Sequence, residues 1–245
     1  MTEEKTQAIV LSSSVYGEND MIISLLTKDF GKISAFAMSA KKSKKRFSGG
    51  IDLFSYLHVQ LKPPKSKSSF LWRLEKTQLL NAFYPLRSDL KALASMSYLS
   101  ECLKKLLADE QKQETIFLWW EQTLNQVANG DCKNNIDYLK MDFELLSMLG
   151  YRPHIYNCVH CAKEQQQERF YFSFEKGGTL CKQCFVAGQG MWINPAQAQM
   201  MNNDNHVIYS EQDIRLLGQL MHRFMVYTLG HEPKSQSFRW DAMQL

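Results

Sequence analysis

Four cysteines in two closely spaced pairs constrain the fold of this chain more than any other feature. The pairs are Cys158 with Cys161 and Cys181 with Cys184, and 19 residues separate one pair from the other. Each C-x-x-C segment can present two thiolates to one ion, and the intervening loop can bring both segments to the same ion. We therefore predict a zinc site with these four cysteines as ligands. Because four thiolates leave no open coordination position, we expect a structural role for the metal.

The sequence lacks several motifs that are typical of enzymes. A zinc deaminase would need H-x-E or C-x-E upstream of P-C-x-x-C, but Asn157 and Leu180 precede the two cysteine pairs. The Walker A, H-E-x-x-H and G-x-S-x-G motifs are also missing from the sequence. We therefore expect a protein that is not an enzyme.

The chain has no sequence feature of a membrane or secreted protein. Its polar N-terminus lacks an apolar signal-peptide core, and no apolar run approaches the roughly 18 residues of a spanning helix. Four of the six cysteines are in metal spacing. We expect a cytoplasmic protein with no membrane partner.

Positive charge is concentrated in the first third of the chain. Residues 1–80 carry 13 Lys and Arg against 7 Asp and Glu, a net charge of +6. Residues 81–245 carry 16 against 18, a net charge of −2. A local excess of this kind predicts a polyanion as the partner of the N-terminal region.

Residues 6–80 have the pattern of a small closed barrel. Short β-branched and apolar runs alternate with charged, Gly-containing or Pro-containing turns, which is typical of strands in such a barrel. We expect five strands: Thr6–Ser14, Met21–Thr27, Lys32–Met38, Leu53–Leu61 and Phe70–Leu80.

The rest of the chain is predicted to be mainly helical, which gives an α+β multidomain fold. Helices are expected after an N-cap at Ser88, over Glu114–Ala128, over Asn135–Leu149, briefly at Asn194-Pro195, and from Ser210 to Gly230. A strand at Arg169–Phe174 and a turn before Cys181 make residues 151–190 a zinc-ribbon-like module. We predict two domains, residues 1–80 and residues 81–245, with this module inserted in the second.

Two basic loops of the predicted barrel are candidates for nucleic-acid contact. The first contains Lys41, Lys42, Lys44, Lys45 and Arg46, followed by Phe47, and the second contains Lys62, Lys65 and Lys67. Lys and Arg bind phosphates, and aromatic rings can stack on bases. The stacking candidates are Phe36, Phe47, Tyr56 and Trp72. The alternatives are loops that only aid solubility and aromatic rings that pack in the core.

The order of these parts resembles the bacterial recombination mediator family RecO. The resemblance rests on segments distributed over nearly the whole chain: Ala8–Leu11, Tyr16–Asp20, Gly31-Lys32, Lys41–Phe47, Leu149–Pro153, Cys158–Cys161, Gly177-Gly178 and Leu180–Cys184. One departure concerns the cysteine segments, since the family often has Gly after the second cysteine whereas Ala162 and Phe185 stand here.

The resemblance implies an OB-fold N-terminal domain, a helical domain with a zinc module, and a non-enzymatic role in DNA repair and recombination. It also implies binding to single- and double-stranded DNA, annealing of complementary strands, and contact with RecR and the single-stranded-DNA-binding protein. Such proteins help to load the RecA recombinase.

Two other functions are compatible with the same residues. An OB-fold protein that binds RNA would use the same phosphate and stacking contacts. A structural adaptor would use the barrel only to bind protein partners.

Overall fold

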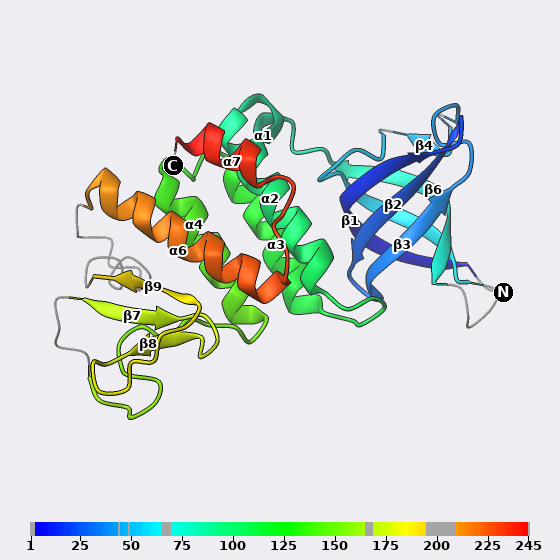
Figure 1. The fold of residues 1–245 in the computed structure, drawn as a ribbon. Coiled ribbons are helices and arrows are strands. Elements are labelled where there is room, and N and C mark those ends of the chain that lie inside the picture. Colours follow the sequence, from blue (N-terminus) through cyan, green and yellow to red (C-terminus); the bar gives the residue numbers. More distant parts are fainter. Residues whose placement is uncertain are drawn as a thin grey trace. The chain divides into compact units, whose positions relative to one another are not determined.

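The computed structural model describes residues 3–43, 45–48, 50–64, 70–164, 169–194 and 209–244. The chain forms two compact units, Met1–Asp131 and Cys132–Leu245 (Figure 1). The predicted domains, residues 1–80 and residues 81–245, were divided by type of fold, whereas these units are divided by compactness. The predicted division therefore stays a prediction. Within the described ranges, no helix is both long and apolar enough to cross a bilayer.

A closed five-stranded barrel opens the first unit. Its strands are β1 (Glu4–Tyr16), β2 (Asp20–Thr27), β3 (Gly31–Ala37), β5 (Tyr56–Lys62) and β6 (Leu71–Asn81). Antiparallel pairing gives the order β3-β2-β1-β5-β6, and a parallel pairing between β3 and β6 closes the barrel. The two-residue strand β4 (Phe47–Ser48) pairs with β6. This is the architecture of an OB-type barrel, so the predicted fold class is confirmed for this region.

Alternation of side chains builds the barrel core. In β3, Ile33, Ala35 and Ala37 are buried while the residues between them are half-buried, as expected where one face of a strand is packed. β1 is long enough to pair with β5 through its first half and with β2 through its second. A bulge between Val10 and Ser12 separates these halves and changes which residues of β1 face outward.

Three helices complete the first unit: α1 (Tyr84–Ser88), α2 (Leu90–Leu106) and α3 (Glu114–Ala128). The sequence predicted α3 at its observed bounds. It placed the N-cap of α2 at Ser88, and this was wrong because Ser88 ends α1. The Asp89 side chain caps α2 by accepting a hydrogen bond from the Ala92 amide at 3.0 Å. Helix α2 lies on β1, where the Ser100 hydroxyl donates to the Leu11 carbonyl at 2.9 Å.

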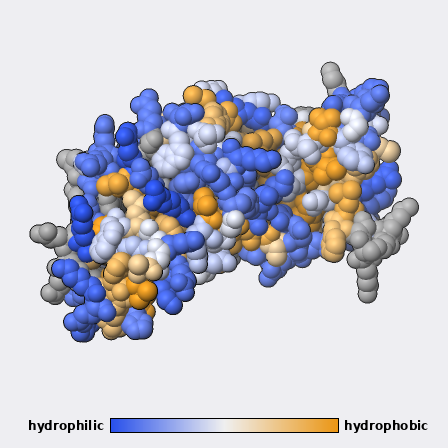
Figure 2. All heavy atoms as spheres, in the orientation of Figure 1, coloured by the Kyte–Doolittle hydropathy of each residue, from blue (hydrophilic) through white to orange (hydrophobic). Residues whose placement is uncertain are grey.

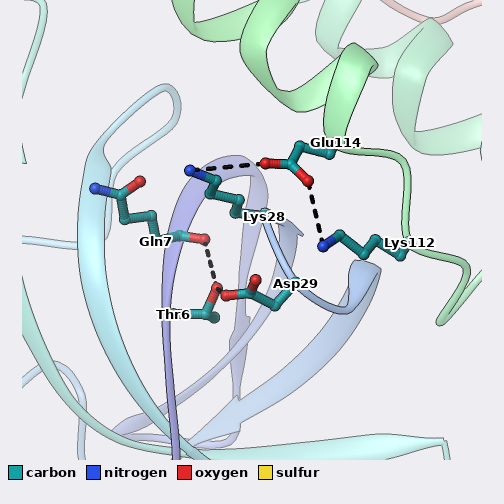
Figure 3. Close-up of polar contacts among 6 residues, drawn as sticks. All are labelled: Thr6, Gln7, Lys28, Asp29, Lys112 and Glu114. Carbon is teal, nitrogen blue, oxygen red and sulfur yellow. Dashed lines mark hydrogen bonds and ion pairs between the residues drawn. The ribbon is translucent and has the colours of Figure 1, made fainter.

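Polar contacts connect the β2–β3 turn with the start of α3 (Figure 3). Glu114 lies 3.8 Å from the Lys28 ammonium and 3.2 Å from the Lys112 ammonium. The Thr6 hydroxyl donates to the Asp29 carboxylate at 2.6 Å. The charged side chains are partly exposed, so each ion pair contributes little to stability, but together they fix this turn against the helix.

The second unit combines helices with a small sheet. Its elements are α4 (Asn135–Met148), β7 (Phe170–Ser173), β8 (Gly178–Leu180), β9 (Gly190–Ile193), α6 (Glu211–Leu229) and α7 (Gln236–Met243). The sheet has the order β8-β7-β9, and α4 packs against α6. The expected turn of helix at Pro195 lies outside the described residues.

Candidate metal centre and nucleic-acid interface

The four predicted metal ligands come together in the structure. The sulfur atoms of Cys158, Cys161, Cys181 and Cys184 all lie within 4.8 Å of one another. The Sγ atoms of Cys161 and Cys181 are 3.8 Å apart. A tetrahedral ion with zinc–sulfur bonds of about 2.3 Å requires sulfur atoms roughly 3.8 Å apart. The cluster therefore has the donors and the size to hold one metal ion.

Tight turns aim each cysteine pair at the centre of the cluster. In the first turn, the Ala162 amide donates to the Cys158 carbonyl at 2.8 Å. In the second, the Cys184 amide donates to the Cys181 carbonyl at 3.0 Å. Ala162 has a φ of +59°, in the left-handed region, whereas Phe185 is not among the residues with positive φ. Of the two departures from Gly noted in the sequence, only Ala162 has an unfavourable backbone conformation.

The small sheet joins the two cysteine turns. Val159, in the first turn, donates its amide to the Thr179 carbonyl at 3.0 Å, two residues before Cys181. The Thr179 amide in turn donates to the His154 carbonyl at 2.8 Å. A Cβ atom at Gly178 would lie 2.6 Å from that carbonyl, so only Gly allows this approach.

The pKa values of Cys158 and Cys184 are shifted in opposite directions. Burial opposes ionisation of Cys158, but hydrogen bonds from the backbone amides of Cys181, Cys161 and His160 outweigh it and lower the pKa of this thiol to about 6. Burial, followed by hydrogen bonding with the other three thiols, raises the pKa of Cys184 to about 12. The lowered pKa of Cys158 makes its thiol easier to deprotonate near neutral pH. This favours metal binding, because the thiolate is the form that binds the metal.

The first basic loop presents exposed cations. Lys41, Lys42 and Lys45 are exposed, and in the described part of the chain they take part in no ion pair. Lys44 lies outside the described residues.

The side chains of Arg46 and Phe47 make structural contacts within the first unit. The Arg46 guanidinium donates to the Met38 carbonyl at 2.6 Å and to the Ser43 hydroxyl at 3.0 Å. It also lies 5.0 Å above the Phe47 ring. Phe47 is only 5% exposed and packs in the barrel core. Burial of this ring leaves no face for a base, and Arg46 holds the loop together.

Lys62, the described lysine of the second basic set, is less available to an anion. Lys62 forms ion pairs with Glu3 at 3.2 Å and Glu75 at 3.3 Å, and these hydrogen-bonded carboxylates raise the pKa of its ammonium group. Lys65 and Lys67 lie outside the described residues. Of the described lysines in the two basic sets, Lys41, Lys42 and Lys45 of the first loop are therefore more accessible to phosphate than Lys62.

The predicted stacking residues divide into buried and accessible rings. Tyr56 and Trp72 are buried, and the Trp72 indole donates to the Glu110 carboxylate at 2.6 Å. Phe36 is half-buried and packs edge-on against Tyr16, with ring centroids 5.9 Å apart. Tyr16 was missed by the sequence analysis. The signal that could have found it is the run Ser12, Ser14, Tyr16, which keeps one face of β1 polar and open beyond the bulge.

Fold and site together define a class: OB-barrel proteins that carry a cationic loop on the barrel and a closed four-cysteine cluster beyond it. Family models agree with this organisation. Residues 1–94 match the model "Recombination protein O N terminal" and residues 87–237 match "Recombination protein O C terminal". The chain belongs to the RecO family.

Individual relatives cover most of the chain. The chain is 31% identical over 180 residues to "DNA repair protein RecO" of Caldanaerobacter subterraneus subsp. tengcongensis, which covers 74% of this chain and 70% of the relative. A protein of the same name from Bacillus pumilus is 29% identical over 217 residues, covering 88% and 80%. The one from Myxococcus xanthus is 34% identical over 181 residues, covering 73% and 71%.

Proposed function

We propose that this protein is a non-enzymatic mediator of DNA repair and recombination that binds single- and double-stranded DNA and anneals complementary strands. The observation that carries the proposal is the set of exposed lysines Lys41, Lys42 and Lys45 in the first barrel loop, which form no ion pair within the described part of the chain, in a chain that belongs to the RecO family. The family's repair role would place the protein with DNA in the bacterial cytoplasm.

Annealing follows from charge neutralisation. Two DNA backbones repel each other, and a cationic surface that holds both lowers that repulsion while leaving base edges free to pair. The net charge supports this view, because residues 1–131 carry 18 Lys and Arg against 14 Asp and Glu, whereas residues 132–245 carry 11 of each. Such a surface needs neither nucleotide hydrolysis nor a helix that reads sequence.

Zinc is the metal that we assign to the four-cysteine cluster, since four thiolates in a tetrahedral arrangement are its usual structural site. When bound, it would link the two cysteine turns and supply folding energy to the module around them. The resemblance further supports RecR, the single-stranded-DNA-binding protein and the RecA pathway as partners.

The salt dependence of DNA binding tests the proposal. The variant Lys41→Ala/Lys42→Ala/Lys45→Ala removes exposed cations and spares Arg46, which holds the loop. If all three lysines contact phosphate, the log–log slope of single-strand affinity against salt should fall by about 2, since each contact contributes roughly 0.7. The matched control is Lys133→Ala/Lys163→Ala/Lys182→Ala, which removes the same charge from exposed positions of residues 132–245.

An unchanged slope in the loop variant, or an equal fall in the control, would contradict the assignment of DNA binding to this loop. Failure of the wild-type protein to bind DNA at low salt would contradict the function itself. Preference for an RNA oligonucleotide over DNA of the same sequence would favour the RNA-binding alternative.

A further inference from the structure

The four thiols of the cysteine cluster differ in their access to solvent. Cys158 and Cys181 are buried, Cys184 is half-buried and Cys161 is exposed. The two buried cysteines belong to an apolar cluster with one residue each of β7 and β8, and Cys184 packs against this cluster whereas Cys161 lies outside it. Cys161 is therefore the thiol of the cluster that a small dissolved molecule reaches first.

The first cysteine turn is open to solvent over its middle residues as well. Val159 is 36% exposed and His160 is exposed. Figure 2 shows hydrophobic residues at the surface in the region where Figure 1 draws β7 and β8. An accessible thiol in such a turn suits reaction with a small oxidant, because oxidation of cysteine follows exposure.

The exposed thiol lies next to a buried thiol of the other pair. The Sγ atoms of Cys161 and Cys181 are 3.8 Å apart, although the two residues are 20 positions apart in the sequence. The sulfur atoms of a disulfide are about 2.05 Å apart, so this pair needs to approach by roughly 1.8 Å. The Cys161 side chain has room for this movement because it is not packed in the apolar cluster.

Backbone hydrogen bonds hold the two cysteine turns side by side without the thiols. The Val159 amide donates to the Thr179 carbonyl at 3.0 Å, and Thr179 is fully buried. Within the first turn, the Cys158 amide donates to the Lys163 carbonyl at 2.9 Å. Two reacting groups held close together combine far more readily than the same groups free in solution.

We propose that Cys161 is an oxidation site, and that hydrogen peroxide converts Cys161 and Cys181 into a disulfide that joins the two cysteine turns. In the first step the Cys161 sulfur attacks the peroxide: an S–O bond forms, the O–O bond breaks, and the hydroxide that leaves takes up a proton to become water. In the second step the Cys181 sulfur attacks the sulfenic acid: an S–S bond forms, the S–O bond breaks, and a second water leaves. The two sulfur atoms lose two electrons in total, one peroxide is reduced to two waters, and the two thiol protons end in these waters.

The disulfide would change what links the two turns. It removes two of the four thiolates, so a metal held by four sulfur atoms would be released. The new bond then joins the turns in place of the metal, and thiol reductants can reverse it. This inference rests on the proposed zinc assignment for the release of metal only, since the disulfide itself needs no metal.

Mass spectrometry can identify the first disulfide. Wild-type protein, zinc-loaded or stripped by a chelator, is treated with hydrogen peroxide, its remaining thiols are blocked, and it is digested with trypsin without reductant. Cleavage after Lys182 separates Cys181 from Cys184, and fragmentation between Cys158 and Cys161 distinguishes those two residues. We expect a peptide linked through Cys161 and Cys181 as the main first product, release of zinc to a chromogenic chelator in step with it, and reversal of both by dithiothreitol and added zinc.

Two variants that each remove one accessible ligand give a matched comparison. Both are tested without metal, so that their equal loss of a ligand does not affect the result. Cys161→Ser should slow the loss of free thiols, whereas Cys184→Ser should react at the wild-type rate and still join Cys161 to Cys181. Cys132→Ser changes a cysteine outside the cluster and should behave as wild type. Circular dichroism checks that each variant keeps its secondary structure.

A first disulfide within either pair, Cys158 with Cys161 or Cys181 with Cys184, would overturn the inference. Equal rates in Cys161→Ser and Cys184→Ser would also overturn it, as would oxidation to sulfinic acid that dithiothreitol does not reverse. Zinc-loaded protein that forms no disulfide at peroxide concentrations that oxidise the metal-free protein would overturn it and leave the zinc assignment standing. Wild type that forms this disulfide but never contains zinc would support the oxidation site and contradict the zinc assignment.

Discussion

At the scale of single residues, Ala162 has an energetically unfavourable backbone conformation, whereas the sequence showed only that Gly is not present at this position. Its φ of +59° follows directly after the first cysteine pair, and a left-handed conformation costs a residue with a Cβ about 1–2 kcal/mol. Gly adopts this conformation freely. We predict that Ala162→Gly raises the free energy of unfolding of the second unit by about 1 kcal/mol in urea titrations at saturating zinc.

The matched control for this change is Ala187→Gly, at an exposed position near the second cysteine pair that is not among the positive-φ residues. There the extra freedom of Gly in the unfolded chain should leave stability unchanged or slightly lower. Equal effects at both positions would contradict a local backbone cost at Ala162.

Residue types predicted the cysteine cluster better than they predicted which aromatic rings are exposed. Cysteine spacing alone specifies four ligands, since a pair in C-x-x-C can converge on one ion whatever the rest of the chain does. Aromatic residues carry no such information. Phe47, Tyr56 and Trp72 are buried while Tyr16 is exposed, and this depends on strand register, the bulge in β1 and the cover by α2, none of which a linear pattern displays.

At the scale of elements, helices α4 and α7 are joined by a buried ion pair. The Arg239 guanidinium lies 2.9 Å from one Asp142 carboxylate oxygen and 3.0 Å from the other, and both side chains are almost fully buried. Burial raises the pKa of Asp142, and the charge and hydrogen bonds of Arg239 act in the opposite direction. Removing one partner of such a pair leaves an uncompensated buried charge, which typically costs 3–5 kcal/mol.

We predict that Arg239→Met lowers the free energy of unfolding by about 3 kcal/mol or more at pH 8, and by less at pH 5. A carboxyl whose folded pKa is raised contributes stability that is present below its ordinary pKa near 3.9 and lost as pH rises through the folded pKa. Without Arg239, its charge and hydrogen bonds no longer oppose the effect of burial, which raises the pKa of Asp142. Urea titrations at both pH values measure the difference.

The control is Asp142→Asn/Arg239→Met, which removes both charges. It should recover part of the lost stability and show the same loss at pH 5 and pH 8. A pH dependence of Arg239→Met that matches this double variant would show that Asp142 is not the titrating group.

Elements with strong periodicity could be predicted from the sequence. The apolar spacing and the Gly after the last turn gave α3, α4 and α6 to within a residue or two, because local propensity and helix-ending residues determine them. The short helix α1 was missed, since five residues are too few to show a helical period. The closure of the barrel by β3 and β6 depends on residues far apart in sequence and could be expected only from the barrel class.

At the scale of the whole molecule, we expect the metal to stabilise the second unit and to have little effect on the stability of the barrel in the first unit. We predict one zinc ion per chain, and we expect Cys181→Ser to lose it. Because metal binding is coupled to folding of its ligand segments, amide hydrogen exchange should rise across residues 151–190 while β1–β3 stay protected. Elemental analysis that finds no zinc in anaerobically purified wild-type protein would contradict the assignment, and Cys102→Ser, which changes a cysteine outside the cluster, is the matched control.

The account's central claim is that the cationic barrel loop holds DNA strands in a state that can pair. The most direct test mixes labelled complementary oligonucleotides at low salt, without ATP, and follows duplex formation with no protein, with wild type and with Lys41→Ala/Lys42→Ala/Lys45→Ala. We predict that wild type accelerates pairing and that the variant loses most of this acceleration at equal protein concentration. Pairing that is slowed or unchanged by wild type at every concentration would contradict the claim, since it would mean that the protein covers DNA without annealing it.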